Sequence, residues 1–278
     1  MPDVPAEWEE ALARAAAARR VAVLGPTDAG KSAFVAALAE RRPECRVVDL
    51  DPGQKMIGPP GTASLGRLAP GRRLDRFVFL GSTSNGSFRA LAAAAAELTR
   101  RARRGFIANT SGYVAGPGLR MQAMTLEALR PDLVVAIDAP AGFEALLARR
   151  QAVRLARPAA ARRKTPAMRR AIRQAAFAEA LAGAAERPLP PPAWEPAPSL
   201  AVGGPERPVC ALADPAGEDR ALGILLAPDR LLTRFRGLAA RVRLGRMWAQ
   251  PHGAGWKLLD TLSPAWDVPQ ALSPTSSP

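Results

Sequence analysis

A segment close to the N-terminus reads Val21-Ala22-Val23-Leu24-Gly25-Pro26-Thr27-Asp28-Ala29-Gly30-Lys31-Ser32. It fits the pattern G-x-x-x-x-G-K-[ST], with an apolar strand expected before it and a helix expected over 31–40. Glycines let such a loop curl until its backbone N–H groups point inward, and the N-terminus of the following helix adds a positive dipole. In this pattern the lysine, here Lys31, contacts the β- and γ-phosphates, and the hydroxyl of Ser32 is a ligand of Mg²⁺. The segment therefore predicts a site for a nucleoside triphosphate with Mg²⁺.

The sequence on either side of this loop alternates between apolar runs and helix-forming segments. Strands are expected at 46–50, 77–80, 106–108 and 133–137, and helices at 7–20, 91–103 and 119–129. Strands that are apolar throughout and alternate with helices are typical of a parallel sheet covered on both faces. We therefore expect an α/β fold of the P-loop NTPase type, with a mostly parallel sheet and helices on both faces.

An acidic motif follows the second expected strand. It reads Asp49-Leu50-Asp51-Pro52-Gly53-Gln54, and Asp51 comes nineteen residues after Ser32. Because ligands of open α/β sheets bind at the carboxyl edge of the strands, both carboxylates are expected near the phosphate loop. Either one could hold a Mg²⁺-bound water or accept a proton from an attacking hydroxyl. The alternative is a polar turn at the end of a strand.

Composition limits the remaining possibilities. The 278 residues carry a net charge of +14, which favours an anionic partner, although 35 of the 39 basic residues are arginine and a GC-rich genome would also give that bias. Two cysteines and one histidine give neither a disulfide framework nor a zinc site. No long apolar run and no signal peptide is present, so we expect no membrane partner and a reducing, cytoplasmic location.

The class of triphosphate enzyme follows from what surrounds the loop. The guanine-reading pattern N-K-x-D is absent, and an acidic residue that closes the second strand favours a kinase. Residues 145–178 contain ten basic residues and no acidic one in a helix-forming background. Such a segment suits a basic helical lid, over about 149–182, that closes on phosphates. The alternative is a solvated, arginine-rich helix.

The C-terminal part of the chain differs in composition. Six prolines at 187–198 indicate a stiff linker, and the next segments, at 209–213, 222–226, 231–235 and 240–244, predict short strands that begin with a hairpin. We therefore expect a P-loop kinase domain over 1–186, a linker over 187–198, a small β-domain over 199–262, and a disordered tail over 263–278.

Five ordered motifs together resemble one family, the polynucleotide 5′-hydroxyl kinases of pre-mRNA cleavage, tRNA splicing and ribosomal RNA processing. Besides the phosphate loop and the acidic motif, they are Pro59-Pro60-Gly61-Thr62-Ala63-Ser64, Phe79-Leu80-Gly81-Ser82-Thr83-Ser84, and Asn109-Thr110-Ser111-Gly112-Tyr113-Val114 with Gly116 and Gly118. The resemblance extends from about Val21 to Ile137 and resumes weakly through the basic segment and in the final strands around 223–247.

The resemblance implies ATP and Mg²⁺ as cofactors and a nucleic acid with a free 5′-hydroxyl end, RNA or DNA, as the partner. Asp51 would activate the hydroxyl, and Ser32, Asp49, Asp51 and Gln54 form the expected metal set. The expected lid arginines are Arg169, Arg170 and Arg173, and the expected substrate clasp is Thr110, Ser111, Gly112 and Tyr113. The expected nucleotide-binding residues are Gly25, Pro26, Thr27, Asp28, Ala29, Gly30, Lys31, Ser32 and Ala33.

The chain departs from the family pattern at two points. The clasp aromatic, usually tryptophan in the family, is Tyr113 here, and a phenol ring can still stack on a base. Larger relatives carry an N-terminal β-domain, and because about 20 residues precede the first strand we expect a short form without it. Two other functions stay open: a catalytically weak ATP-binding adaptor in an RNA-processing complex, with protein partners, and a kinase of a small nucleoside-like substrate.

Overall fold

The computed structural model describes residues 5–84, 87–102, 105–189, 206–227 and 229–259. A seven-stranded sheet has the order β4-β3-β2-β5-β1-β6-β7. Its strands are β1 (Arg20–Leu24), β2 (Arg46–Asp49), β3 (Thr62–Arg67), β4 (Arg73–Phe79), β5 (Phe106–Asn109), β6 (Leu133–Ile137) and β7 (Ala152–Leu155). Strands β2, β5, β1, β6 and β7 are parallel, whereas β3 and β4 run antiparallel to their neighbours. The expected mostly parallel α/β sheet is confirmed.

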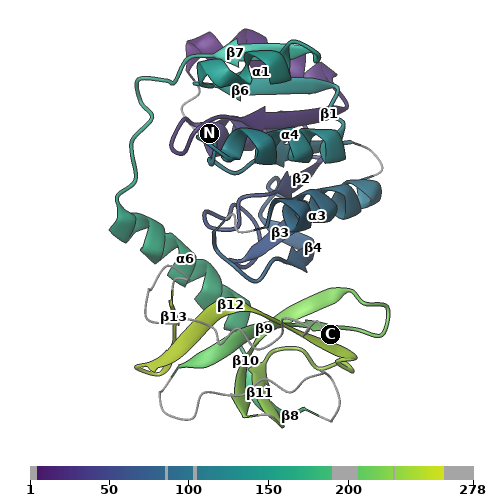
Figure 1. The fold of residues 1–278 in the computed structure, drawn as a ribbon, viewed down its shortest axis with the longest axis vertical. Helices are drawn as coiled ribbons and strands as arrows, with labels where there is room; N and C mark the ends of the chain where they lie inside the picture. The colour runs from purple at the N-terminus through teal and green to yellow at the C-terminus, as the bar shows by residue number, and fades with distance from the viewer. Residues whose placement is uncertain (1–4, 85–86, 103–104, 190–205, 228, 260–278) are drawn as a thin grey trace, which may run out of the picture.

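Helices cover both faces of this sheet, as Figure 1 shows. They are η1 (Ala6–Trp8), α1 (Glu9–Ala17), α2 (Lys31–Arg41), α3 (Phe88–Arg101), α4 (Gly118–Leu129), η2 (Ala141–Phe143) and α5 (Glu144–Leu147). Side chains of β1 alternate between the two faces: Leu24 is buried against the α3–α4 layer and Val23 against the α1–α2 layer. Two apolar cores, one on each face, therefore fix the position of the loop that follows β1.

The sequence analysis missed two strands of this sheet, and it also missed β8 (Ala185–Pro188) and β13 (Gly255–Leu259) of the second sheet. The first is β3, and it pairs with β4, so the expected strand at 77–80 is the end of an antiparallel edge hairpin. The second is β7, which lies where a helical lid was expected and adds a parallel edge strand beside β6. The lid segment thus consists of β7, an extended connection, and one helix, α6 (Pro166–Leu181).

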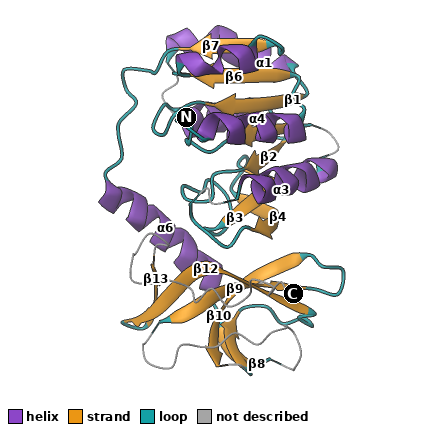
Figure 2. Cartoon of the chain, in the orientation of Figure 1, coloured by secondary structure: helices purple, strands orange, loops and turns teal. Residues whose placement is uncertain are grey.

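A second, antiparallel sheet of six strands has the order β13-β12-β9-β10-β11-β8 (Figure 2). Its strands are β8 (Ala185–Pro188), β9 (Arg207–Ala213), β10 (Asp219–Ala227), β11 (Arg230–Thr233), β12 (Arg241–His252) and β13 (Gly255–Leu259). The expected hairpin is confirmed as β9–β10. Strand β8 pairs with β11, so this sheet includes residues expected in the first domain and in the linker. Residues 190–198 of that linker and the expected tail lie outside the described residues.

Helix α6 joins the two halves of the molecule (Figure 1). Its Phe177 is fully buried in an apolar cluster that contains Phe79 of β4 and Ile224 of β10. The amide of Gln174 binds β13 at two points: it donates to the Trp256 carbonyl at 2.7 Å and accepts from the Leu258 N–H at 2.8 Å. The C-terminal half of α6 is therefore packed on the second sheet.

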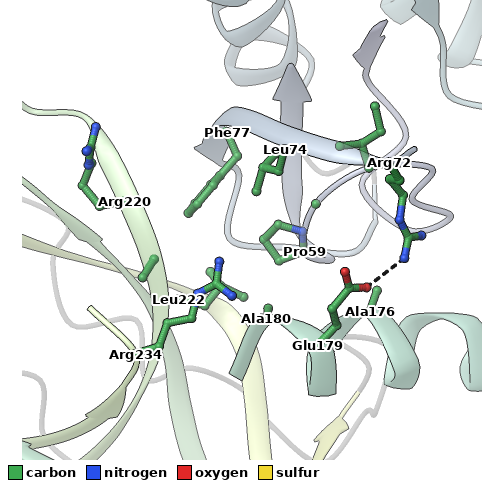
Figure 3. A pocket seen from close by; sticks show the side chains of 13 residues that line it. Pro59, Arg72, Leu74, Phe77, Ala176, Glu179, Ala180, Arg220, Leu222 and Arg234 are labelled. Carbon is green, nitrogen blue, oxygen red and sulfur yellow. Dashed lines mark hydrogen bonds and ion pairs between the residues drawn. The ribbon is translucent and has the colours of Figure 1, made fainter. Parts of the chain in front are cut away.

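A cavity of about 560 Å³ lies at this junction, between β4, α6 and β10 (Figure 3). Apolar side chains, among them Phe77 and Leu222, form part of its wall, and Arg72 donates to Glu179 of α6 at 3.0 Å. No residue of the loop 25–32 lines this cavity, so it is not the phosphate site that the sequence predicts. Within the described ranges, no helix has the length and apolar character needed to cross a membrane.

Candidate phosphate-transfer site

The loop between β1 and α2 forms the floor of the site. Gly25 has a φ of +148°, and a Cβ atom there would lie 2.0 Å from the Ile137 carbonyl oxygen, so this position requires glycine. The Lys31 ammonium donates to the carbonyls of Gly25 at 2.9 Å and Pro26 at 2.8 Å, which holds the side chain along the loop. Trp8 packs edge-to-face on Phe34 of α2 with ring centroids 5.3 Å apart, and thereby supports the loop from the protein interior.

A cavity of about 690 Å³ lies over this loop. It brings the phosphate loop, the acidic motif, the end of β5 and the segment before α6 to one place. The lining residues are Thr27, Asp28, Gly30, Lys31, Ser32, Ala33, Asp51, Gln54, Asn109, Ala161, Arg162 and Lys164. The expected nucleotide-binding residues Gly25, Pro26 and Ala29 belong to the loop but do not line this cavity. Sequence segments more than a hundred residues apart thus meet at the carboxyl edge of the sheet.

The two acidic residues of the motif have different surroundings. Asp49 is completely buried, and both of its carboxylate oxygens accept hydrogen bonds: Oδ1 from the Asn109 amide at 3.0 Å and Oδ2 from the Met56 N–H at 2.7 Å. The ammonium of Lys55, also buried, lies 3.2 Å from Asp49 Oδ2. Asp49 does not line the cavity. Its contacts are those of a structural carboxylate.

Asp51 faces the cavity instead. Its Oδ1 accepts hydrogen bonds from the N–H groups of Gly53 at 3.0 Å and Gln54 at 2.9 Å, which fixes the carboxylate at the start of the loop. Burial, followed by the nearby Asp49 charge, raises the pKa of Asp51 above its ordinary value. A carboxylate with a raised pKa in a cavity is suited to accept a proton.

Side-chain oxygens suitable for Mg²⁺ gather beside Asp51. Gln54 Oε1 and Asn109 Oδ1 are both buried without a hydrogen-bond partner, and both residues line the cavity together with Ser32. Carboxylate, amide and hydroxyl oxygens are the ligands that Mg²⁺ takes in proteins, usually with water and phosphate oxygens. The residues present therefore fit a Mg²⁺ ion. Asn109 was quoted in the sequence analysis as part of a motif but not expected in the metal set.

Lys31 is nearly buried, and burial lowers its pKa to about 8, while Asp51 and Asp28 act in the opposite direction. The ammonium of Lys164 also lowers this pKa, which places a second cation close to Lys31. An anion that entered the cavity would favour the charged form of both amines. The site is therefore electrostatically prepared for a polyphosphate.

The expected clasp loop divides into a buried part and an exposed part. Thr110 and Ser111 are buried, and Thr110 donates its hydroxyl to the Val23 carbonyl at 3.0 Å. Gly112 lies against the phosphate loop, because a Cβ atom there would come within 2.4 Å of Thr27 Oγ1. Tyr113 is 37% exposed, and its ring centroid lies 6.3 Å from that of Phe88. Of these four residues, Tyr113 is the one able to stack on a base.

The three arginines that were expected to form the lid do not line the cavity over the phosphate loop. Arg169 donates to the carboxylate of Asp28 at 2.6 Å, and neither Arg170 nor Arg173 lines the cavity. The segment before α6 instead brings Arg162 and Lys164 into the lining. Sequence reasoning placed both residues in the lid without singling them out. Their position directly before the N-cap Thr165 and Pro166 was the available signal.

The fold and the cavity define a class, the P-loop NTPase fold: a parallel sheet whose first strand leads into a phosphate loop, with a carboxylate just after the end of β2. The family model of the mRNA cleavage and polyadenylation factor CLP1 P-loop matches residues 25–183, which is more than half of the chain. The chain therefore belongs to the CLP1 P-loop family. The resemblance to polynucleotide 5′-hydroxyl kinases is confirmed.

Curated relatives support this placement. A polyribonucleotide 5′-hydroxyl-kinase of Pyrococcus furiosus is 29% identical over 160 residues, which are 49% of this chain and 43% of that protein. The corresponding kinase of Pyrococcus horikoshii is 30% identical over 132 residues, 42% of this chain and 37% of the relative. A CLP1 homolog of Dictyostelium discoideum is 29% identical over 143 residues, 43% of this chain and 31% of its own length. The matches thus span less than half the length of these relatives.

Among solved structures, the complex of wild-type Clp1p with Pcf11p (454–563) is similar in fold. The TM-score is 0.64 at 13% identity, and the alignment covers 86% of this chain and 77% of the other. The aligned share of this chain exceeds the share that the P-loop half contributes, so the likeness in fold extends into the C-terminal half.

Proposed function

We propose that this chain is a polynucleotide 5′-hydroxyl kinase, which transfers the γ-phosphoryl group of ATP to the 5′-hydroxyl end of RNA or DNA. The cavity carries the proposal, because it joins Lys31, Ser32 and Asp51 with two basic side chains. The names of the archaeal relatives support a kinase that acts on polyribonucleotides. The family supports ATP as the nucleotide.

In the proposed reaction, Asp51 receives the proton of the acceptor hydroxyl. The hydroxyl oxygen forms a bond to the γ-phosphorus, and the bond between that phosphorus and the β–γ bridging oxygen breaks, so ADP leaves with the electron pair. The raised pKa of Asp51 makes its carboxylate a stronger proton acceptor than that of an ordinary aspartate. Asp49 has no part in this step, since its oxygens are occupied by Lys55 and by backbone and amide N–H groups.

Positive charge in the cavity stabilises the transferring group. Lys31, Arg162 and Lys164 surround the position expected for the phosphates. Oxygens of Ser32, Gln54 and Asn109, next to Asp51, would hold Mg²⁺, which when bound shields phosphate charge. Most of the catalytic effect is then positioning and charge neutralisation by groups that are already in place.

Tyr113 holds the acceptor end in this proposal. Its exposed ring is adjacent to Phe88 and close in sequence to Gly112, which touches the phosphate loop. A base stacked on Tyr113 would therefore place its ribose near the cavity. Stacking on an aromatic ring tolerates any base, so the proposal includes both RNA and DNA.

We also propose a reducing, cytoplasmic location. Both cysteines of the chain, Cys45 and Cys210, are buried as free thiols. Burial raises the pKa of both thiols, to about 12 for Cys210, which keeps them protonated and unreactive.

The test is transfer from ATP labelled at the γ-phosphate to a 5′-hydroxyl oligonucleotide. RNA and DNA are run in parallel with their 5′-phosphorylated forms and with a free nucleoside. We expect label on hydroxyl-ended polymers only, and none with the Lys31→Ala variant. Label on the nucleoside alone would identify a small-molecule kinase. Tight ATP binding without transfer to any acceptor would identify an ATP-binding adaptor.

A further inference from the structure

The phosphate loop contains a carboxylate that the proposed reaction does not use. Asp28 lies in the middle of the loop, lines the cavity, and has a side chain that is only 4% exposed. Its φ of +62° is uncommon for a residue other than glycine, although Asp is among the residues that tolerate it. An unpaired carboxylate at this place would repel a polyphosphate.

Cations from the lid segment neutralise this carboxylate. Asp28 Oδ2 accepts hydrogen bonds from the Lys164 backbone N–H at 3.0 Å and from Arg169 Nη2 at 2.6 Å. The Lys164 ammonium lies 3.5 Å from Asp28 Oδ1. Arg169 Nε also donates to the Lys164 carbonyl at 3.3 Å, so the two partners bind each other. The start of α6 and the segment before it are thereby fastened to the phosphate loop.

We propose that Asp28 is a positioning residue that couples docking of the segment 161–169 to binding of the polyphosphate. With the segment docked, Asp28 carries one negative charge against the two positive charges of Lys164 and Arg169, and Lys164 and Arg162 line the cavity. With the segment undocked, the Asp28 carboxylate alone would face the phosphates. Docking and polyphosphate binding therefore favour each other, and by linkage the coupling is reciprocal.

This inference rests on the proposed function only in taking a nucleoside polyphosphate as the ligand. It gives Arg169 a different role from direct stabilisation of the transferring phosphoryl group. If Arg169 acts through Asp28, nucleotide affinity no longer depends on the arginine once the Asp28 carboxylate is removed. If Arg169 contacts phosphate itself, nucleotide affinity still depends on the arginine without that carboxylate. The two roles thus predict opposite outcomes for one double variant.

The experiment is a double-variant cycle of Asp28→Asn and Arg169→Gln, read by calorimetric titration with Mg·ADP and no oligonucleotide. Arg169→Gln alone is expected to weaken binding about tenfold, since it removes the closer of the two cations that neutralise the Asp28 carboxylate and loosens the docked segment. Asp28→Asn alone is expected to change affinity by less than about threefold, because lost docking and lost repulsion oppose each other. The double variant is expected to bind within about threefold of the wild type.

A defect of Arg169→Gln that persists at full size in the Asp28→Asn background overturns the inference, as does an Arg169→Gln variant that binds like the wild type. The matched control is Arg163→Gln, an exposed arginine of the same segment that does not line the cavity. It should bind Mg·ADP as the wild type does. Denaturation midpoints of all variants report whether each one is folded.

Hydrogen exchange of the Lys164 amide gives a second readout without nucleotide. Its N–H donates to Asp28, so protection is expected in the wild type and is expected to fall about tenfold in Asp28→Gly, which tolerates the positive φ and leaves that N–H without its acceptor. Unchanged protection overturns the inference. If the double-variant cycle gives the expected affinities for Mg·ADP but no phosphate is transferred to an oligonucleotide, the proposed function alone is refuted. Failure of the wild type to bind any nucleotide would refute both.

Discussion

Substitution of the two carboxylates in the acidic motif tests the account, because loss of Asp49 is predicted to lower stability and loss of Asp51 is predicted to lower activity. The Asp49→Asn variant should unfold more easily than the wild type, whereas the Asp51→Asn variant should stay stable and transfer phosphate much more slowly. Asp49 is completely buried against Lys55, whose side chain is 2% exposed. Removing one partner of a buried ion pair costs about 3–5 kcal/mol, since the remaining charge has no counterion. Burial lowers the pKa of Lys55, which shows how costly that charge is.

The surroundings of Asp51 in the folded protein disfavour its charged form. Its pKa is raised, so the folded state binds a proton more readily than the unfolded chain, and the charged carboxylate is unfavourable in the native site. An amide at this position should therefore cost less than about 1 kcal/mol of stability. The loss of a general base, in contrast, should lower kcat by about 10²–10⁴-fold.

Both variants can be measured by denaturant unfolding and by label transfer to a 5′-hydroxyl oligonucleotide. The matched control is Asp49→Asn combined with Lys55→Met, which removes both charges and should recover most of the lost stability. An Asp49→Asn variant as stable as the wild type would refute the structural role. An Asp51→Asn variant with undiminished kcat would refute the assignment of the base.

Further predictions concern pH, the clasp and salt. Because a lysine with a lowered pKa loses its charge at a lower pH than usual, kcat/KM for ATP should fall above about pH 8 as Lys31 deprotonates. On the acid side, kcat/KM should fall as the pH drops through the pKa of Asp51, which is raised above that of an ordinary aspartate; a pH profile with neither an acid limb nor an alkaline limb would contradict both assignments. Tyr113→Ala should raise the KM for oligonucleotides by about 5–150-fold, the equivalent of ~1–3 kcal/mol of stacking, whereas Tyr113→Phe should leave this KM unchanged. An equal rise of the KM in both variants would mean that the Tyr113 hydroxyl, and not the ring, binds the substrate. The KM for oligonucleotides should rise steeply with salt, because phosphate contacts release counterions, whereas a small nucleoside-like substrate would show little dependence.

Local patterns predicted much of the fold. The phosphate loop, the alternation of apolar strands with helices, and the β9–β10 hairpin are all short-range signals. Strand β3 was missed because Thr62 and Ser64 are buried there as a polar pair, 3.0 Å apart, in place of an apolar run. Strand β7 was missed because an edge strand tolerates charge: Arg154 is exposed and pairs with Glu144.

Other features of the site depend on tertiary contacts and could not be predicted from the sequence. Asp49 and Asp51 have the same residue type and lie two residues apart at the end of β2, and their different contacts, among them those of Asp49 with the Lys55 side chain and the Asn109 amide, distinguish them. Arg169 reaches a carboxylate 141 residues away, which no spacing rule indicates. Helix α6 was expected to cover phosphates with its whole length, yet its apolar Phe177 faces the second sheet. A helix with a basic and an apolar face does not indicate which sheet it will pack on.

The account makes one central claim, that the cavity passes phosphate directly from ATP to a 5′-hydroxyl end. The measurement that tests it most directly is a single-turnover reaction with γ-labelled ATP and 5′-hydroxyl RNA, followed by complete digestion to nucleoside 5′-monophosphates. The account predicts label in the monophosphate of the 5′-terminal nucleotide alone, and none with Lys31→Ala. Label that appears only as inorganic phosphate, or that does not appear outside ATP, would contradict it.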